Sequence, residues 1–224
     1  MKLSTLVHTL INDSPFIQES LDNNLINTTS LARYLQPQIV KHLDKTVKVS
    51  AIVMAIQRRP INMSLMLDKS LTSFMSNLGD VLVRSDIYDY TYSHSYTFRF
   101  NQIKFLQQLK DESNSYYSFC RGMNETTIVV NSTIKHLVLK TFKNERLIVS
   151  RENLAAISIS LPSDNQDTSG VYYTLLKRLA WQGINIIEVI STSNEISLVV
   201  SKEDIDTVFS IIMKLKAAGS QKSS

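Results

Sequence analysis

The feature that most constrains the fold is a regular alternation of strand and helix patterns over residues 151–216. Ile157, Ile159 and Leu161 alternate with serines, which is typical of a strand with one buried face. A stripe of apolar residues at helical spacing follows and ends at Gly183, a residue suited to the left-handed position after a helix. Two apolar runs and a second amphipathic helix complete the order strand, helix, strand, strand, helix. They span residues 184–190, 195–200 and 204–215.

Residues 80–150 show nearly the same order. Runs of β-branched and aromatic residues predict four strands, and two stripes at helical spacing predict two helices between them. The predicted strands span 81–90, 116–120, 125–130 and 146–149, and the predicted helices span 102–110 and 132–141. The order βαββαβ belongs to the α+β class, whereas the block at 151–216 lacks a last strand of its own.

Short motifs in the C-terminal block closely resemble the ACT domain at the C-terminus of aspartokinases, in order and in spacing. The motifs are Ser169 to Val171, Gly183 to Ser193, Glu195 to Val200 and Asp204 to Asp206. The resemblance implies a ferredoxin-like regulatory fold whose units pair side by side into one continuous sheet, often as dimers. In aspartokinases two such units exchange a strand, which would account for the missing last strand. Residues 146–149 could serve one unit while the C-terminal block borrows its edge pairing.

The resemblance also implies an amino-acid ligand at an interface between ACT units. In the family, the ligand is held by the backbone of the loop between the first strand and the first helix, and by the start of the second strand. Physical chemistry favours the same place, because Gly170 lets the backbone approach closely, the following helix N-terminus attracts a carboxylate, and Asn185 can donate and accept. Carried over to this chain, the ligand-binding positions are Asp167, Thr168, Ser169, Gly170, Val171, Tyr172, Asn185 and Ile186.

The predicted ligand loop departs from the family pattern. It is longer than usual, and Ser169 stands where the family usually has proline. The corresponding loop at 93–100 has no glycine, so we expect no functional site in the block at 80–150, which resembles an ACT unit by element order alone. Two alternatives stay open for the C-terminal block: an amino-acid sensor, or an ACT unit that serves only as a dimerisation scaffold.

Residues 1–60 are predicted to form a helical module that loosely resembles a helix-turn-helix. Residues 29–35 would be the supporting helix and residues 50–59 the recognition helix, with an extra helix at 38–43 between them. The module carries seven Lys/Arg against four Asp/Glu, a mildly basic balance that permits nucleic-acid binding without demanding it. A solvated helix end is the simpler explanation for the paired arginines. The candidate DNA-binding residues are Lys48, Ser50, Gln57, Arg58 and Arg59.

No catalytic constellation is apparent. The Lys-Phe-Gly-Gly start of the aspartokinase catalytic domain is absent, and five scattered glycines cannot build a phosphate-binding loop. Cys120 lacks a base placed to activate it, and the four histidines share no metal-ligand spacing, so we expect neither a metal nor a cofactor. A single cysteine, with neither a signal peptide nor a membrane-spanning apolar run, predicts a cytoplasmic protein that does not enter the membrane.

The sequence therefore predicts a non-catalytic, amino-acid-sensing regulator that forms homodimers or higher homo-oligomers. Ligand binding would change what the N-terminal module contacts, and DNA is one candidate partner. The alternative is an ACT-mediated interaction protein that regulates an amino-acid biosynthetic enzyme in trans without binding DNA. The predicted organisation is a helical module at 1–60, a linker or connecting helix at 61–79, ACT-like units at 80–150 and 151–216, and a flexible tail at 217–224.

Overall fold

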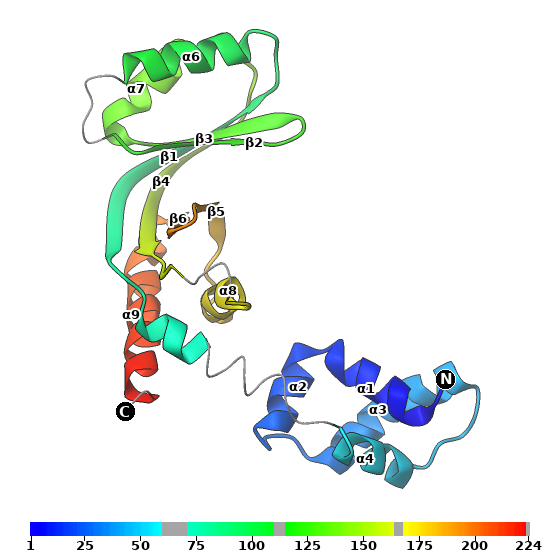
Figure 1. Cartoon of the computed structure of the whole chain (residues 1–224). Coiled ribbons are helices and arrows are strands. Elements are labelled where there is room, and N and C mark those ends of the chain that lie inside the picture. The colour runs from blue at the N-terminus through cyan, green and yellow to red at the C-terminus, as the bar shows by residue number, and fades with distance from the viewer. Residues whose placement is uncertain (60–70, 110–114, 164–167, 223–224) are drawn as a thin grey trace. The chain divides into compact units, whose positions relative to one another are not determined.

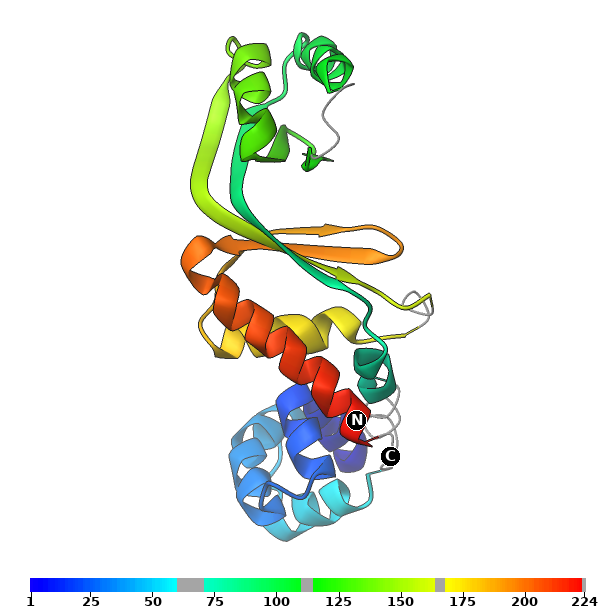
Figure 2. The ribbon, with the colours of Figure 1, turned by 90° about the vertical axis from the view of Figure 1, so that its left-hand side faces the viewer.

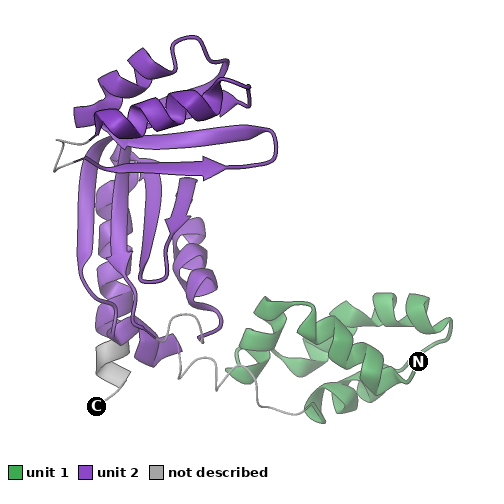
Figure 3. Ribbon diagram, turned by 45° about the horizontal axis from the view of Figure 1, so that its top comes forward, with its two compact units in different colours: residues 1–70 green, residues 71–224 purple. Residues whose placement is uncertain are grey.

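The chain folds into two compact units, residues 1–70 and 71–224, which Figure 3 colours separately. The structure, a computed structural model, describes residues 1–59, 71–109, 115–163 and 168–222. Most of the predicted linker and one predicted ligand-binding residue, Asp167, lie outside the described residues. Each unit has a hydrophobic core of its own.

The first unit packs its helices around one apolar core. They are α1 (Leu3–Asn12), α2 (Pro15–Asp22), α3 (Thr28–Leu43) and α4 (Val49–Gln57). Asn27 caps α3, because its side-chain oxygen accepts hydrogen bonds from the N–H groups of Thr29 (2.9 Å) and Ser30 (3.0 Å). Apolar residues at helical spacing face inward. The buried residues are Leu6, Val7, Ile11, Leu31, Ala32, Leu35, Ile39, Val47, Ile52, Ala55 and Ile56.

The structure corrects two expectations for this unit. A separate helix at 38–43 does not form, because α3 continues through Pro37. Proline in a helix interior removes one backbone hydrogen bond, but the apolar stripe continues past it and buries Ile39 completely, so packing outweighs that loss. The predicted recognition helix at 50–59 differs in its bounds, since α4 begins at Val49, directly after the N-cap residue Lys48, and ends at Gln57.

The second unit is built on one antiparallel sheet of six strands, in the order β2-β3-β1-β4-β6-β5 (Figures 1 and 2). The strands are β1 (Val81–Ser93), β2 (Tyr117–Arg121), β3 (Glu125–Asn131), β4 (Leu147–Ser160), β5 (Ile186–Ser191) and β6 (Glu195–Ser201). The helices are α6 (Phe98–Gln108), α7 (Ser132–Thr141), α8 (Val171–Trp181), the short η1 (Lys202–Asp204) and α9 (Ile205–Lys222). Residues 71–76 are also helical.

The long strands β1 and β4 belong to both halves of this sheet. Residues 87–93 of β1 pair with β3 and with the first part of β4, completing a first lobe with α6 and α7. Residues 81–84 of β1 pair with residues 156–159 of β4 and form the edge of a second lobe, which contains β5, β6, α8 and α9. The second lobe thus obtains its last strand from residues that precede it in the sequence.

One continuous strand, β4, joins most of the two segments predicted as separate strands, since it includes residues 147–149 and 157–160. The expected boundary between residues 150 and 151 therefore falls inside a strand. Asn153 in β4 and Asp86 in β1 have φ of +57° and +55°, and both lie where the register of the pair shifts between the lobes. These irregularities let the paired strands β1 and β4 pass from the first lobe into the second.

Each lobe buries a core between its sheet face and its helices. In the first lobe, Tyr90 and Tyr92 face the helices, and the Tyr92 ring stacks on Phe142 with 5.4 Å between centroids. Strand packing therefore explains the positions of these two tyrosines. In the second lobe, Ile157 and Ile159 face α8 and α9, in agreement with their predicted alternation.

Candidate functional site

A cavity of about 800 Å³ opens at one end of the second lobe, between the β4–α8 connection and the β5–β6 turn. Predicted ligand-binding residues from Thr168 to Tyr172 line one side of it. The structure therefore gathers the loop part of the predicted site around a real cavity. The described lining residues are Leu161, Thr168, Ser169, Gly170, Val171, Tyr172, Tyr173, Ser191, Thr192 and Ser193.

Gly170 shapes the wall of this cavity at the start of α8. Its φ of +87° lies in the left-handed region, which residues with a side chain rarely adopt. A Cβ here would lie 3.2 Å from Cδ1 of Leu71, tighter than ordinary van der Waals contact. Gly170 is the N-cap of α8, and no side chain of the described residues caps that helix. The first N–H groups of a helix lack intrahelical acceptors, so this positive end of α8 suits an anion.

Hydroxyl groups supply most of the polar lining. The Tyr172 hydroxyl lies 2.7 Å from Oγ of Ser191, a hydrogen bond that joins α8 to the end of β5. Ser191 Oγ can also donate to the carbonyl oxygen of Thr192 (3.2 Å) or of Glu195 (3.1 Å). None of the described lining side chains carries a formal charge at neutral pH. The side chains of these walls therefore offer hydrogen bonds but no formal charge.

Asn185 and Ile186 lie away from this cavity. They stand at the beginning of β5, whereas the cavity meets β5 at its end, Ser191. With a rise of roughly 3.3 Å per residue, the two ends of β5 are about 17 Å apart. One chain therefore does not bring the two parts of the predicted ligand site together.

Sequence reasoning missed the cavity residues Leu161 and Tyr173 and those at 191–193. The missing information was the direction of β5, which is parallel to β4 because both strands pair antiparallel to β6. Parallel strands joined through a helix end at the same edge of a sheet, so the β5–β6 turn had to lie beside the β4–α8 loop. The predicted order of strand, helix and strand was the signal from which this arrangement could have been inferred.

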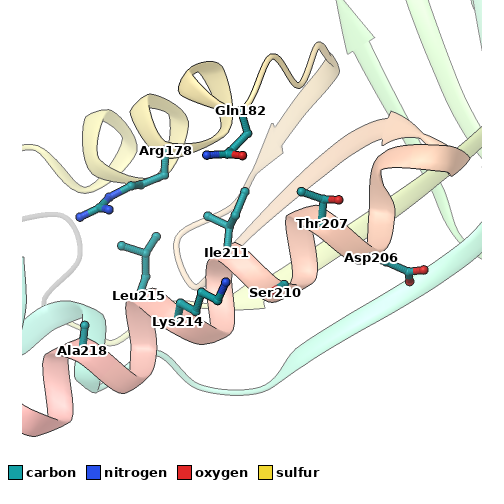
Figure 4. A pocket seen from close by; sticks show the side chains of 9 residues that line it. All are labelled: Arg178, Gln182, Asp206, Thr207, Ser210, Ile211, Lys214, Leu215 and Ala218. Carbon is teal, nitrogen blue, oxygen red and sulfur yellow. The ribbon is translucent and has the colours of Figure 1, made fainter.

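A second groove, of about 560 Å³, lies between α8 and α9 (Figure 4). Arg178 and Lys214 enter its lining from the two helices, and neither forms an ion pair with a described residue. Asp206 lies at the opposite end of the groove from Arg178 in Figure 4. The groove thus combines two cations with an apolar floor. The other lining residues are Gln182, Thr207, Ser210, Ile211, Leu215 and Ala218.

The candidate DNA-binding residues divide into two groups. Lys48, Ser50, Gln57 and Arg58 are exposed, but Arg59 forms an ion pair with Asp22 in which the side chains are only 8% and 2% exposed. Arg59 therefore ties the end of α4 to α2 within the unit. The helix arrangement does not by itself establish a helix-turn-helix, and DNA binding stays a prediction.

The carboxyl group of Asp89, on the helix-free side of the sheet, has a shifted pKa. The Asp89 side chain is fully buried, and Arg151 Nη1 donates to its Oδ2 at 2.6 Å. Burial raises the pKa of Asp89, and the bond and charge of Arg151 oppose that rise. The pKa of Glu188 is raised by burial and by the charge of Asp89. These residues form a structural contact between β1, β4 and β5.

The described residues contain no group of three or more His, Cys, Asp or Glu side chains placed to hold a metal ion. Among the helices of this same part of the chain, none is long and apolar enough to cross a membrane. Cys120 is exposed on β2.

No protein-family model and no curated protein matches the sequence. Solved structures do match the fold. The regulatory subunit of aspartate kinase from Thermus thermophilus superposes with a TM-score of 0.50 and 13% identity, over 62% of this chain and 97% of the subunit. Aspartate kinase from Clostridium acetobutylicum gives a TM-score of 0.50 and 12% identity, over 62% of this chain and 34% of the enzyme.

At this level of identity the similarity concerns the fold alone. The match with the Thermus subunit spans nearly all of a regulatory protein, and it supports the ACT-like fold implied by the motifs. The chain spans about one third of the length of the Clostridium kinase. The second unit therefore has the fold of an aspartokinase regulatory subunit.

Proposed function

We propose that the protein is a non-catalytic regulator whose second lobe binds a free amino acid in the cavity at the start of α8. The observation that carries this proposal is the N-terminus of α8, which no side chain of the described residues caps and which opens into a cavity lined by the predicted loop residues. The fold shared with an aspartokinase regulatory subunit supports it.

The cavity offers a partner for each end of a zwitterion. The carboxylate would accept hydrogen bonds from the first N–H groups of α8. The ammonium group would donate to the hydroxyl and carbonyl oxygens of Ser191, Thr192 and Ser193. Since the described walls are uncharged, an amino acid with a neutral side chain fits better than a lysine or a glutamate.

A second copy of the chain would complete the site. Asn185 is exposed and lies about one strand length from the cavity of its own chain, so only a neighbouring chain could bring it to a ligand. The strands β5 and β2 are the outer strands of the sheet, and either can pair with the same strand of a partner. Amino-acid binding at such an interface would favour a homodimer.

The output of the regulator is carried by the N-terminal unit in this proposal. Lys48, Gln57 and Arg58 are exposed there and can contact phosphates if the partner is DNA. The second candidate function is regulation of an enzyme in trans, and the groove between α8 and α9 favours it. Arg178 and Lys214 would bind an acidic segment of that enzyme above the floor formed by Ile211.

A thermal-shift screen against the common amino acids tests the proposed function. A ligand at 100 times its dissociation constant adds about 2.7 kcal/mol of stability, which is easily measured. The stabilisation should decrease in Ser191→Ala and persist in Ser210→Ala, a matched change in the other groove. If no amino acid stabilises the wild type, the sensor is refuted and the ACT-like unit is a scaffold for interactions.

A further inference from the structure

The backbone around the loop after the first strand has the same hydrogen bonds in both lobes. In the first lobe, the N–H of Ser93 donates to the carbonyl of Arg146 (3.0 Å), and the N–H of His94 donates to the carbonyl of Asn124 (3.0 Å). These bonds connect the end of the lobe's first strand with the start of its last strand and with the turn between its two middle strands. They define a frame in which the lobes can be compared residue by residue.

In the second lobe, the N–H of Ser160 donates to the carbonyl of Asp80 (2.9 Å), and the N–H of Leu161 donates to the carbonyl of Asn194 (2.8 Å). Asp80, which directly precedes β1, thus corresponds to Arg146, which directly precedes β4. The residues that directly precede these two positions are Glu145 in the first lobe and Gly79 in the second.

The Glu145 carboxylate lies at the N-terminal end of α6. Glu145 is 9% exposed, and its oxygens accept hydrogen bonds from Ser95 Oγ (2.5 Å), Thr97 Oγ1 (2.7 Å) and Asn101 Nδ2 (2.6 Å). Ser95 Oγ in turn accepts from the N–H of Phe98, the first residue of α6 (3.0 Å). These donors hold the carboxylate as a protein holds a bound anion at the start of a helix.

Gly79 leaves the matching place in the second lobe without a side chain. A Cβ here would lie 2.8 Å from the Cβ of Ser160, so a larger residue could not be accommodated without a shift of the chain. The carbonyl of Gly79 accepts from Lys216 Nζ (2.9 Å), which fixes the segment in this position. In the described part of this lobe, no side chain caps the start of α8.

We propose that the N-terminal end of α6 is a carboxylate-binding site that Glu145 fills from within the chain, whereas the equivalent end of α8, which no described side chain fills, is left for an external carboxylate. Removing the Glu145 side chain would therefore create a site for small monocarboxylates such as acetate or formate. The chain would bind one effector molecule, in the second lobe, and this consequence rests on the proposed function. The first-lobe site does not depend on it.

Chemical rescue tests the proposal. Thermal unfolding of the full chain is followed by circular dichroism at neutral pH, in sodium acetate and in sodium chloride of equal ionic strength. Glu145→Ala should melt about 5–10 °C below the wild type in chloride, because three donors lose their charged acceptor. At about 200 mM, acetate should restore several degrees to this variant relative to chloride. If the variant is unfolded in chloride, folding in acetate is the same rescue.

Two control variants identify the rescued site. Glu145→Gln fills the same space, so acetate should not raise its melting temperature more than that of the wild type. Glu152→Ala removes an exposed carboxylate that pairs with Lys135 at 2.8 Å, and it should also show no specific gain. Acetate bound at α8, or a general salt effect, would shift all the proteins alike. An equal response of Glu145→Ala and its controls would overturn the inference, while leaving the second-lobe site to its own test.

Discussion

Two glycines with the same left-handed backbone offer a direct test of how the cavity wall is built. Gly170 has a φ of +87° and Gly183 a φ of +72°. An alanine in this region costs about 1 kcal/mol or more at either position, because the Cβ crowds the following carbonyl. The surroundings differ, since a Cβ at Gly170 would lie 3.2 Å from Leu71 Cδ1, while nothing lies within 4 Å of one at Gly183.

The difference between the two substitutions measures the contact with Leu71. Leu71 packs against the core of the second lobe, so it cannot yield freely, and forced packing of this kind costs about 1–3 kcal/mol. We therefore expect Gly170→Ala to lose about 2–4 kcal/mol of unfolding free energy and Gly183→Ala about 1–2 kcal/mol. Urea denaturation followed by circular dichroism gives both values.

A Leu71→Ala background separates the backbone strain at Gly170 from the contact with the Leu71 side chain. When the isobutyl group is absent, Gly170→Ala should cost no more than Gly183→Ala, because only the backbone strain remains. Equal losses for the two glycines in the wild-type background would refute the close approach of Leu71 to the start of α8. A larger loss at Gly183 would refute it more strongly.

Other consequences concern the core and the first unit. Asn27→Ala should cost about 1 kcal/mol, since α3 loses its cap, and a urea titration showing no loss would contradict the cap. Tyr90 and Tyr92 have their pKa raised to about 12, mainly by burial, so they should remain neutral until that pH. The stability that they give as neutral rings is present below their unfolded pKa near 10 and is lost as the pH rises through 12. Absorbance at 295 nm in an alkaline titration should show them ionising late, and ionisation near pH 10 while folded would contradict their burial. In Arg151→Met, the buried Asp89 loses its ion pair, so its raised pKa should rise further. The loss, about 1–3 kcal/mol after allowance for the partly exposed arginine, should be greater at neutral pH than at acidic pH, where protonation of Asp89 relieves it. Equal losses at both pH values in denaturant titrations would contradict this.

Local patterns predicted most elements because each element here follows its own apolar periodicity. The alternation at Ile157 and Ile159 and the stripe that ends at Gly183 both correspond to elements of the second lobe. The helix ends there as expected, since the N–H of Ile184 donates to Leu179 O (3.2 Å) across a glycine with positive φ. These features depend on neighbours in the sequence.

Features that depend on distant neighbours could not be predicted in this way. The predicted boundary between the ACT-like units fell at residues 150 and 151, yet the polar stretch from Ser150 to Asn153 lies inside β4, where the strand passes from one lobe to the other. Its side chains are exposed at this crossing, so polarity does not prevent strand pairing. The loop side of the candidate site was evident from Gly170, whereas the β5–β6 side required the sheet order.

The measurement that tests the central claim most directly is calorimetric titration of a neutral amino acid, chosen from the thermal-shift screen, into the full chain. We expect one molecule per chain, a roughly tenfold weaker affinity in Ser191→Ala, from the loss of one hydrogen bond, and an unchanged affinity in Ser210→Ala. Binding that is lost in Ser210→Ala and retained in Ser191→Ala would contradict the cavity at α8. The absence of heat for every amino acid would contradict the sensor itself.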